Sequence, residues 1–165
     1  MTILEYGPQA ELRDAGSPAH SPAIVERLAG SALFDGIEPA EVGRILAAFD
    51  EQSFSTGHRV TVEGFRGSDF YIVAEGRALV RAKGREVAEL GPGDFFGEIA
   101  VIEGGPRTAS VEAATMLRCL VLSNNRLDAL LVDHPRLAVN LLRAVVSRFR
   151  RVSAQARRRV RVVHH

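Results

Sequence analysis

Gly97, Glu98 and Arg107 have the types and the spacing of a pocket for a small anion joined to a hydroxyl-bearing group. Gly97 lets the backbone approach a ligand closely, and Gly104-Gly105-Pro106 forces a turn. The run from Glu98 to Ile102 can form one or two helical turns, whose free N–H groups and positive dipole end suit a phosphate. Arg107 adds a permanently charged fork for phosphate oxygens, and Glu98 can accept hydrogen bonds from hydroxyls. A sugar that carries a phosphate would explain these residues together.

The chain resembles the cyclic nucleotide-binding domains over the stretch from Phe96 to Ala113, which reads FGEIAVIEGGPRTASVEA. The phosphate-binding cassette of that family runs roughly FGE-[LIM]-A-L-x-x-x-x-PR-[AST]-A-x-V-x-A, and the match is almost unbroken. A looser similarity covers about Ser31 to Arg151, which is most of the chain. A lone glycine-rich turn would be a weak signal, but FGE and PRTA at this fixed separation are specific.

The resemblance implies a role for the matching residues. Arg107 would pair with the cyclic phosphate and Glu98 would hold the ribose 2′-hydroxyl, while backbone amides of the cassette complete the contacts. The alternatives are a surface arginine after a turn and a first-turn acid stabilised by the helix dipole. The amides would come from Gly97, Ile99 and Ala109, and the predicted set of cassette residues comprises Phe96, Gly97, Glu98, Ile99, Ala100, Pro106, Arg107, Thr108 and Ala109.

Thr108 follows the arginine and does not decide the base. Its hydroxyl can reach a phosphate oxygen or a base substituent. Thr at this position of the family is often linked to cGMP, yet many bacterial domains with Ser or Thr here resemble cAMP binders. A β-branched residue at the start of a strand is an equally good interpretation. We expect a cyclic nucleotide as ligand, cAMP in preference to cGMP, and no cofactor.

One position departs from the family pattern. The family commonly has Gly-Asp/Glu-x-Phe-Tyr before its third strand, and the acid supports the cassette arginine. Here Ser68 stands at the place of the acid, and Asp69 is one residue further on. A shift of one residue along a strand moves a side chain to the opposite face. The departure predicts that Arg107 lacks this carboxylate partner, which leaves open how binding is relayed across the roll.

Hydrophobic periodicity predicts helices towards both ends of the chain and strands between them. Apolar residues recur at helical spacing in Pro22–Phe34, Pro39–Phe49, Asn124–Val132 and from Pro135 to about Arg159. Short runs of period two, separated by glycine turns, predict an antiparallel roll or barrel. These runs are Arg59–Val62, Phe70–Ala74, Ala78–Ala82, Glu86–Leu90, Ser110–Ala114 and Leu117–Leu122.

The predicted fold class is therefore α+β. An antiparallel, jelly-roll-like β-roll over about residues 52–122 is flanked by N-terminal helices and by C-terminal helices over about 124–160. The family's fold has the same order of elements. Residues 1–20, with scattered Gly, Pro and Ser, predict a flexible N-terminal arm, and residues 21–165 form the binding domain.

Size and composition fit one folded domain. A chain of 165 residues with 46% hydrophobic residues is long enough for one core and too apolar for a disordered segment. No apolar run has the length of a membrane span, and the N-terminus lacks the pattern of a signal peptide. Cys119 lies alone in an apolar run and is expected to be a buried, inert thiol. We expect a cytoplasmic protein.

The long C-terminal helix is expected to close over the base as a lid. Its apolar residues form two stripes, so that one can cover the roll and the other a second copy of the helix. The stripes are Leu137, Leu141, Val145, Phe149 and Val152, and Ala138, Leu142 and Val146. The family's dimeric transcription regulators pair through this helix, and their base contacts match Val152 and Ser153. These two complete the predicted ligand set, although ordinary helix positions are the favoured alternative for both.

Charge is divided between the body of the chain and its C-terminal segment. Residues 1–133 hold 12 Lys/Arg against 20 Asp/Glu, which gives −8, while residues 134–165 hold nine Arg and no acid, which gives +9. A solvated helix face is the favoured interpretation of these arginines, followed by an acidic protein or membrane headgroups. Nucleic acid would fit the charge, but the chain contains no helix-turn-helix motif.

The resulting hypothesis is a cyclic nucleotide sensor that signals to an effector protein or to a sister subunit by moving its C-terminal helix. Two alternatives keep the fold: the sensor half of a DNA-binding transcription regulator, and a ligand-free scaffold for protein contacts. An enzyme is not expected, because the five histidines show no metal-ligand spacing and no Ser/His/Asp or Cys/His set is evident.

Overall fold

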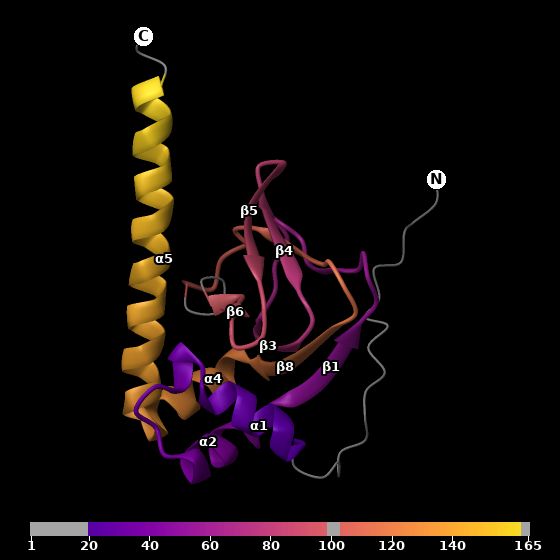
Figure 1. Ribbon diagram of the computed structural model, residues 1–165, viewed down its shortest axis with the longest axis vertical. Helices are drawn as coiled ribbons and strands as arrows, with labels where there is room; N and C mark the ends of the chain where they lie inside the picture. Colours follow the sequence, from indigo (N-terminus) through magenta and orange to yellow (C-terminus); the bar gives the residue numbers. More distant parts are fainter. Residues whose placement is uncertain (1–19, 99–102, 163–165) are drawn as a thin grey trace.

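The computed structural model describes residues 20–98 and 103–162, with side chains up to residue 158 (Figure 1). Its helical elements are α1 (Pro22–Ala29), the 3₁₀ turn η1 (Ala32–Phe34), α2 (Pro39–Leu46), α4 (Asn124–Asp133) and α5 (Pro135–Val162). The predictions for residues 1–19, for Ile99 and Ala100 and for the last three residues lie outside this part of the chain.

The predicted single helix over Pro22–Phe34 is wrong. Ser21 caps α1 through a hydrogen bond that its hydroxyl accepts from the Ile24 amide, and Pro22 occupies the first helical position. The chain leaves the helix at Gly30, where the amide and the hydroxyl of Ser31 both donate to the Leu28 carbonyl, at 3.0 and 2.6 Å. A glycine followed by a serine that competes for the last carbonyls ends the helix, so η1 is a separate turn.

Two antiparallel sheets of four strands form the roll, with strand orders β1-β8-β3-β6 and β2-β7-β4-β5. The strands are β1 (Asp50–Phe54), β2 (Arg59–Thr61), β3 (Asp69–Glu75), β4 (Ala78–Ala82), β5 (Arg85–Leu90), β6 (Phe95–Phe96), β7 (Ser110–Ala113) and β8 (Leu117–Ser123). The predicted α+β roll between N-terminal helices and a long C-terminal helix is confirmed. The strands β1 and β6 were not predicted, because β1 is an almost wholly polar edge strand and β6 has only two residues.

The central strands β3 and β8 separate two cores. Phe70 and Ile72 of β3 face the helices, whereas Tyr71 and Val73 between them face the interior of the roll. Cys119 on β8 belongs to the roll interior and is fully buried. Because side chains alternate between the two faces of a strand, a strand with a core on each face reads as a continuous apolar run. This explains why both strands were predictable from sequence.

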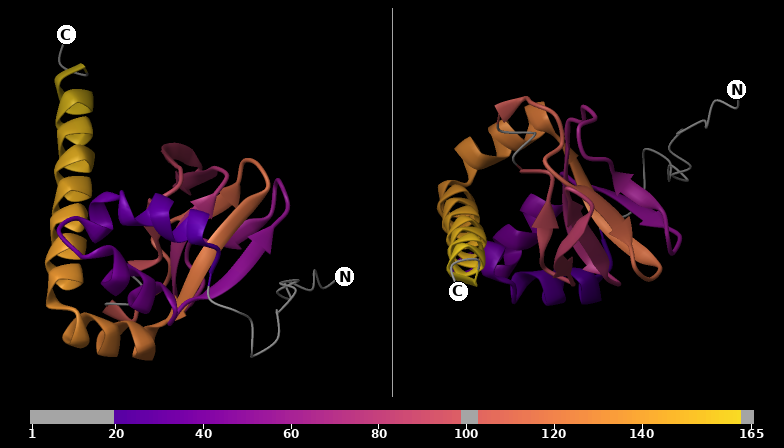
Figure 2. Two further views of the ribbon diagram at one scale, coloured as in Figure 1. Left: turned by 60° about the horizontal axis from the view of Figure 1, so that its bottom comes forward. Right: turned by 90° about the horizontal axis from the view of Figure 1, so that it is seen from above.

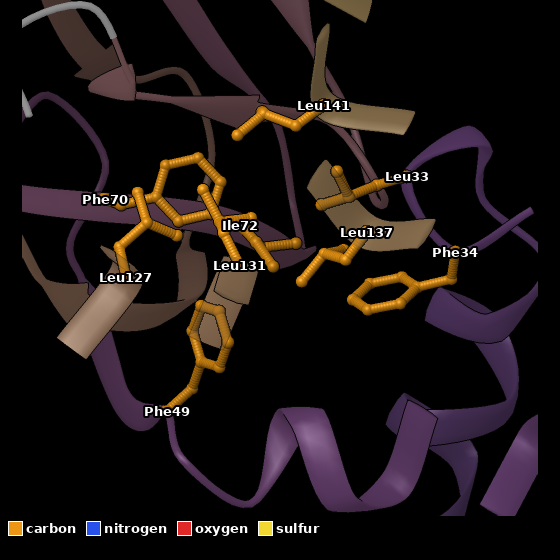
Figure 3. A pocket seen from close by; sticks show the side chains of 9 residues that line it. All are labelled: Leu33, Phe34, Phe49, Phe70, Ile72, Leu127, Leu131, Leu137 and Leu141. Atoms are coloured by element: carbon orange, nitrogen blue, oxygen red, sulfur yellow. The ribbon is translucent and has the colours of Figure 1, made fainter. Parts of the chain in front are cut away.

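The helix-side core packs α4 and α5 onto β3 (Figure 3). Nine apolar side chains converge there around a void of about 10 Å³, and they come from η1, the segment before β1, β3, α4 and α5. The void is close to the smallest that holds a water molecule, and its lining offers no polar partner, so it stays dry. The lining residues are Leu33, Phe34, Phe49, Phe70, Ile72, Leu127, Leu131, Leu137 and Leu141.

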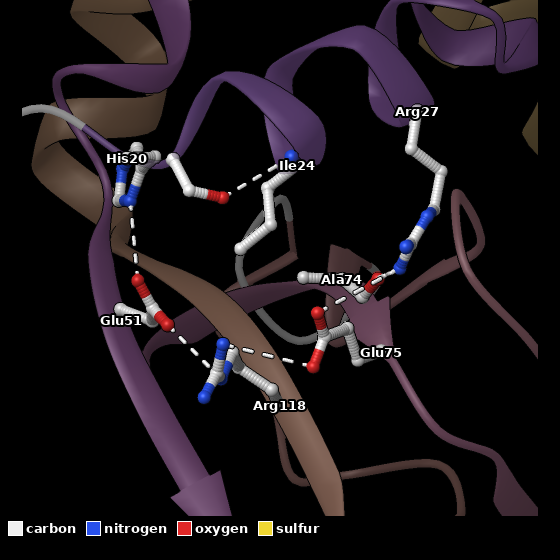
Figure 4. A network of polar contacts seen from close by, with 8 residues as sticks. His20, Ile24, Arg27, Glu51, Ala74, Glu75 and Arg118 are labelled. Carbon is white, nitrogen blue, oxygen red and sulfur yellow. Dashed lines mark hydrogen bonds and ion pairs between the residues drawn. The ribbon is translucent and has the colours of Figure 1, made fainter.

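A chain of polar contacts fastens α1 to the outer face of the first sheet (Figure 4). Glu51 lies between His20 (3.6 Å) and Arg118 (3.0 Å), and Glu75 lies between Arg118 (3.6 Å) and Arg27 (3.9 Å). These pairs are partly exposed, so each contributes little alone and the alternating arrangement is what orients α1. His20, the last residue of the predicted arm, is held by this network and by a 2.7 Å contact to the Leu46 carbonyl.

Helix α5 runs beside the roll and continues past it (Figures 1 and 2). Its first half is anchored by Leu137, Leu141 and the buried Asn140, whose amide donates to the Leu33 and Asp35 carbonyls at 2.9 and 2.8 Å. Phe149 and Val152 are 72% and 63% exposed, so the predicted stripe that ended with them covers the roll only in its first part. No helix among the described residues is long and apolar enough to cross a membrane.

Candidate functional site

The backbone of Arg107 is clamped by the loop that precedes β3. The Arg107 carbonyl accepts from the Gly64 amide (2.9 Å), and the Arg107 amide donates to the Phe65 carbonyl (2.8 Å). Pro106, the residue before Arg107, pairs with Arg66 in an isolated antiparallel bridge. The turn that carries the arginine is thereby an extension of the second sheet.

The side chain of Arg107 is buried, with 7% of its surface exposed. Its Nη1 donates to the carbonyls of Asp69 (3.1 Å) and Gly97 (3.3 Å), and its guanidinium carbon lies 5.9 Å from the centre of the Tyr71 ring. That ring stacks on Phe96 at 4.6 Å, so Phe96 supports the arginine from below. Within the described residues, Nε and Nη2 of Arg107 have no hydrogen-bond partner, and both remain available to an anion.

Two glycines make room for the guanidinium. A Cβ atom at Gly67 would lie 2.4 Å from Nε of Arg107. A Cβ at Gly97, where φ is +87°, would lie 2.6 Å from the Asp69 carbonyl oxygen and 2.8 Å from Nη1 of Arg107. Sequence reasoning assigned Gly97 to ligand approach and did not include Gly67, whose position before β3 was the available signal.

Because Ser68 stands where the family commonly has an acid, the sequence predicts that Arg107 lacks a carboxylate partner. Among the described residues no carboxylate lies within ion-pair distance of Arg107. Two backbone carbonyls hold the guanidinium instead. Burial raises the pKa of the Asp69 carboxyl, and the positive charge of Arg107 partly opposes this shift. Burial, with the nearby Asp69 charge, also raises the pKa of the Tyr71 phenol to about 12.

Glu98 is buried, at 5% exposure, and is paired with the C-terminal helix. Nη1 of Arg148 donates to Oε1 of Glu98 at 3.1 Å, and Nη2 of Arg148 donates to the Phe95 carbonyl. The guanidinium of Arg148 also lies over the Phe95 ring, 4.1 Å from its centre. Sequence reasoning missed this contact. The available signal was an arginine seven residues after Leu141, on the stripe of α5 that packs on the domain.

These side chains surround one pocket of about 50 Å³. Five of its lining residues were predicted, namely Gly97, Glu98, Arg107, Thr108 and Ala109, and two were not, namely Thr61 and Val111. Phe96, which stacks on Tyr71, and the exposed Pro106 are not among the lining residues. Val152 and Ser153 are carried by α5 and are not among the described lining residues. Ile99 and Ala100 belong to the part of the cassette that is not described.

The pocket offers a buried cation and a buried carboxylate. No cluster of three His, Cys, Asp or Glu side chains that could hold a metal ion occurs in the described part of the chain. Among the described residues, Nε and Nη2 of Arg107 and one oxygen of Glu98 have no partner, so the arginine can bind an anion and the carboxylate can accept from a hydroxyl. The chemistry of the pocket is therefore the recognition of a small molecule with both groups.

Comparison with known proteins gives the family. The cyclic nucleotide-binding domain family matches residues 51–134. A CRP-like cAMP-activated global transcriptional regulator of Mycobacterium tuberculosis is 32% identical over 133 residues, which cover 78% of this chain and 59% of that protein. The chain thus spans about three fifths of the length of this relative.

Two solved structures show the same fold. The catabolite activator protein of Thermus thermophilus superimposes with a TM-score of 0.72 at 32% identity, over 76% of this chain and 62% of that one. The N-terminal domain of a transcriptional regulator from Streptomyces coelicolor has a TM-score of 0.61 at 30% identity, over 82% of this chain and 95% of that one. The chain belongs to the cyclic nucleotide-binding domain family, whose members are regulatory binding domains and not enzymes.

Proposed function

We propose that the domain binds a 3′,5′-cyclic nucleotide, with cAMP favoured over cGMP, as a sensor. The observation that carries this proposal is the convergence of the buried Arg107 and Glu98 on one pocket. The free Nε and Nη2 of Arg107 suit the cyclic phosphate, and the Glu98 oxygen that Arg148 does not use suits the ribose 2′-hydroxyl. The preference for cAMP rests on the Mycobacterium tuberculosis relative, which is named for activation by cAMP, because Thr108 fits either base.

We further propose that binding is transmitted through α5. Arg148 is the polar link between the pocket and this helix, because it holds the carboxylate that the ribose would use. A ribose hydroxyl on Glu98 changes the partners of that carboxylate and hence the free energy with which Arg148 keeps α5 docked. The ligand can shift the helix only by the difference between its affinities for the two positions.

Titration calorimetry with cAMP and cGMP tests the binding proposal. Wild-type protein should bind both, and cAMP more tightly. Arg107→Glu should abolish the heat of both nucleotides, because it puts a carboxylate against the phosphate. Arg85→Glu makes the same change of charge at an exposed position of β5 and should bind normally. Absence of heat with the wild type would reject the proposal and favour the ligand-free scaffold.

We also propose that α5 pairs with the α5 of a second copy. Val139, Leu142, Val146 and Phe149 are 40%, 65%, 42% and 72% exposed and recur at alternating intervals of three and four residues. This is the spacing of a coiled-coil seam. The positions after Leu142 and Phe149, and the equivalent position one heptad later, carry Arg143, Arg150 and Arg157.

These arginines favour a parallel pair. In an antiparallel pair they would face the same arginines of the partner helix, whereas in a parallel pair they would face positions occupied by Ala138, Val145 and Val152. Light scattering should give a dimer for the wild type and a monomer for Val146→Glu. Arg151→Glu, on the outer side of the helix, is the control that should remain a dimer. A monomeric wild type would reject the pairing.

A second candidate function is the sensor part of a transcription regulator. It is favoured by the match to 95% of an N-terminal domain of such a regulator and by coverage of only 59% of a full-length relative. The reading frame in the source genome tests this. A frame that continues past His165 into a helix-turn-helix would support it, and a stop codon there would exclude it.

In either case we place the domain in the cytoplasm, where the thiol of Cys119 stays reduced.

A further inference from the structure

The strand β2 contains a bulge beside the pocket. Arg59 pairs with Glu112, but Thr61 pairs with Val111, so that two steps along β2 match one step along β7. Without the extra residue, Thr61 would stand opposite Ser110. Residues directly opposite on neighbouring strands share a face, and Val111 is buried in the pocket wall. The bulge therefore turns Thr61 from the outer face into the pocket.

Beyond this bulge, two side-chain hydroxyls make hydrogen bonds to main-chain groups of the opposite segment. The Thr61 hydroxyl donates to the Ala109 carbonyl at 3.2 Å, and the Ser110 hydroxyl accepts from the Glu63 amide at 2.9 Å. Thr61 is 7% exposed and is one of four buried polar or charged residues of the described chain. Its partner Ala109 lies two residues after Arg107, in the pocket lining. A buried hydroxyl with a fixed partner defines the position of that partner.

We infer that Thr61 is a positioning residue for the phosphate end of the pocket. By holding the Ala109 carbonyl, it restricts rotation about the Cα–C bond of Ala109 and so fixes the segment that leads from Arg107 into β7. The amide of Ala109 and the charge of Arg107 then face the pocket in one arrangement before the ligand arrives. This inference rests on the proposed binding of a cyclic nucleotide.

The position of the Thr61–Ala109 hydrogen bond predicts how loss of the Thr61 hydroxyl changes the affinity for cAMP and cGMP. The hydroxyl acts on the backbone that meets the phosphate, which cAMP and cGMP have in common. Loss of the hydroxyl should therefore weaken both nucleotides by a similar factor, about fivefold, as expected for one buried hydrogen bond. The ratio of the two dissociation constants should stay at the wild-type value.

Calorimetry on Thr61→Val, which keeps the shape and removes the hydroxyl, is the test. Thr61→Ser retains the hydroxyl and should restore most of the affinity. Thr115→Val is the matched control, because the Thr115 hydroxyl also makes hydrogen bonds, with the Arg77 amide and the Met116 carbonyl (both 3.0 Å), but at an exposed turn away from the pocket. It should bind both nucleotides like the wild type even where its melting temperature falls. Thr61→Ala provides a second removal of the hydroxyl if the valine variant does not fold.

Each outcome decides the inference. Unchanged binding by Thr61→Val or Thr61→Ala overturns it, and so does an equal loss in Thr115→Val. A loss confined to one nucleotide also overturns it, because Thr61 would then contact the base. Wild-type protein that binds neither nucleotide overturns the proposed function instead, and this is seen before any variant is measured.

Discussion

The groups that accept hydrogen bonds from Arg107 are neutral. The carbonyls of Asp69 and Gly97 accept from Nη1, and the Tyr71 ring lies beneath the guanidinium. A carboxylate in their place would cancel part of the positive potential that a phosphate senses. With Ser68 in place of an acid, Arg107 is held by two backbone carbonyls and not by a carboxylate.

Gly97→Ala should damage the pocket more than its backbone strain alone explains. Alanine at a positive φ costs about 1–2 kcal/mol, and the new Cβ would also press on the Asp69 carbonyl and on Nη1 of Arg107. Gly84→Ala is the matched control, since Gly84 has a φ of +72° and no atom within 4 Å of the added Cβ. Urea unfolding and nucleotide calorimetry should show destabilisation in both variants and loss of affinity only in Gly97→Ala. Equal affinities would show that Gly97 does not position Arg107.

At the scale of elements, α5 is held by apolar contacts in its first half and by Arg148 in its second. Leu137, Leu141 and Asn140 fasten it to the helix-side core, and Arg148 alone reaches the nucleotide pocket from it among the described contacts. Movement of the second half would therefore leave the first half packed. On the proposal that α5 transmits binding, we expect the helix to bend or undock beyond Ala144, without loss of the core.

Arg148→Gln should loosen the second half of α5. The neutral amide cannot compensate the buried Glu98 carboxylate, and a charged hydrogen bond contributes about 1.5–3 kcal/mol, reduced here because Arg148 is 29% exposed. Hydrogen exchange of α5 amides should become faster beyond Ala144 in the unliganded protein. Arg150→Gln, an exposed arginine on the opposite side of the same turn, should exchange like the wild type. Identical exchange in the two variants would contradict a role for Arg148 in docking.

Elements with a continuous or periodic apolar pattern were predictable, and elements fixed by distant contacts were not. The runs Phe70–Ala74 and Leu117–Leu122 lie within β3 and β8, and the predicted helices after Asn124 and Pro135 match α4 and α5 within three residues at each end. The polar strand β1 gave no alternation, and β6 is too short for any period.

The candidate site shows the same division. Arg107 and Glu98 were indicated by a local motif, whereas Arg148 and Thr61 act through partners about 50 residues away. The bulge that turns Thr61 inward depends on the register of β2 against β7, which a strand of three residues does not specify by its own sequence.

At the scale of the whole molecule, the pocket and the helix belong to different cores. Tyr71 and Phe96, beneath Arg107, pack in the roll interior, while Leu137 and Leu141 of α5 pack in the helix-side core. The two cores share β3 and β8 as their common wall. If α5 transmits binding as proposed, the structural links available between the pocket and the helices are the two shared strands and Arg148.

Stability should fall in alkaline solution because of two buried acids. Burial raises the pKa of Cys119 from 9.0 and that of Tyr71 from 10.0 to about 12 in the folded protein. At a pH between a group's ordinary pKa and its raised pKa in the folded protein, the folded state binds more protons than the unfolded state. The free energy of unfolding therefore declines as pH rises through this range. The contribution is intact below about pH 9. By pH 10 the loss due to Cys119 should be about 1.4 kcal/mol.

Urea unfolding between about pH 8 and pH 10 measures this loss. Cys119→Val removes the thiol from the same buried site, so the difference in free energy of unfolding between variant and wild type isolates it. That difference should grow in favour of the variant as pH rises. A difference independent of pH would show that the thiol ionises in the folded protein at its ordinary pKa.

Because Cys119 is buried, the rate at which a reagent labels its thiol can report how often the roll opens. It lies at 0% exposure in β8, the wall shared by the two cores, and reagents attack the thiolate and not the neutral thiol. Labelling must therefore wait until the sheet opens. Where opening and closing are fast, the labelling rate reports the open population, and a ligand bound only to the closed form slows it by the factor 1 + [L]/Kd. A reagent that never enters the pocket proposed for the nucleotide would thus read out its occupancy.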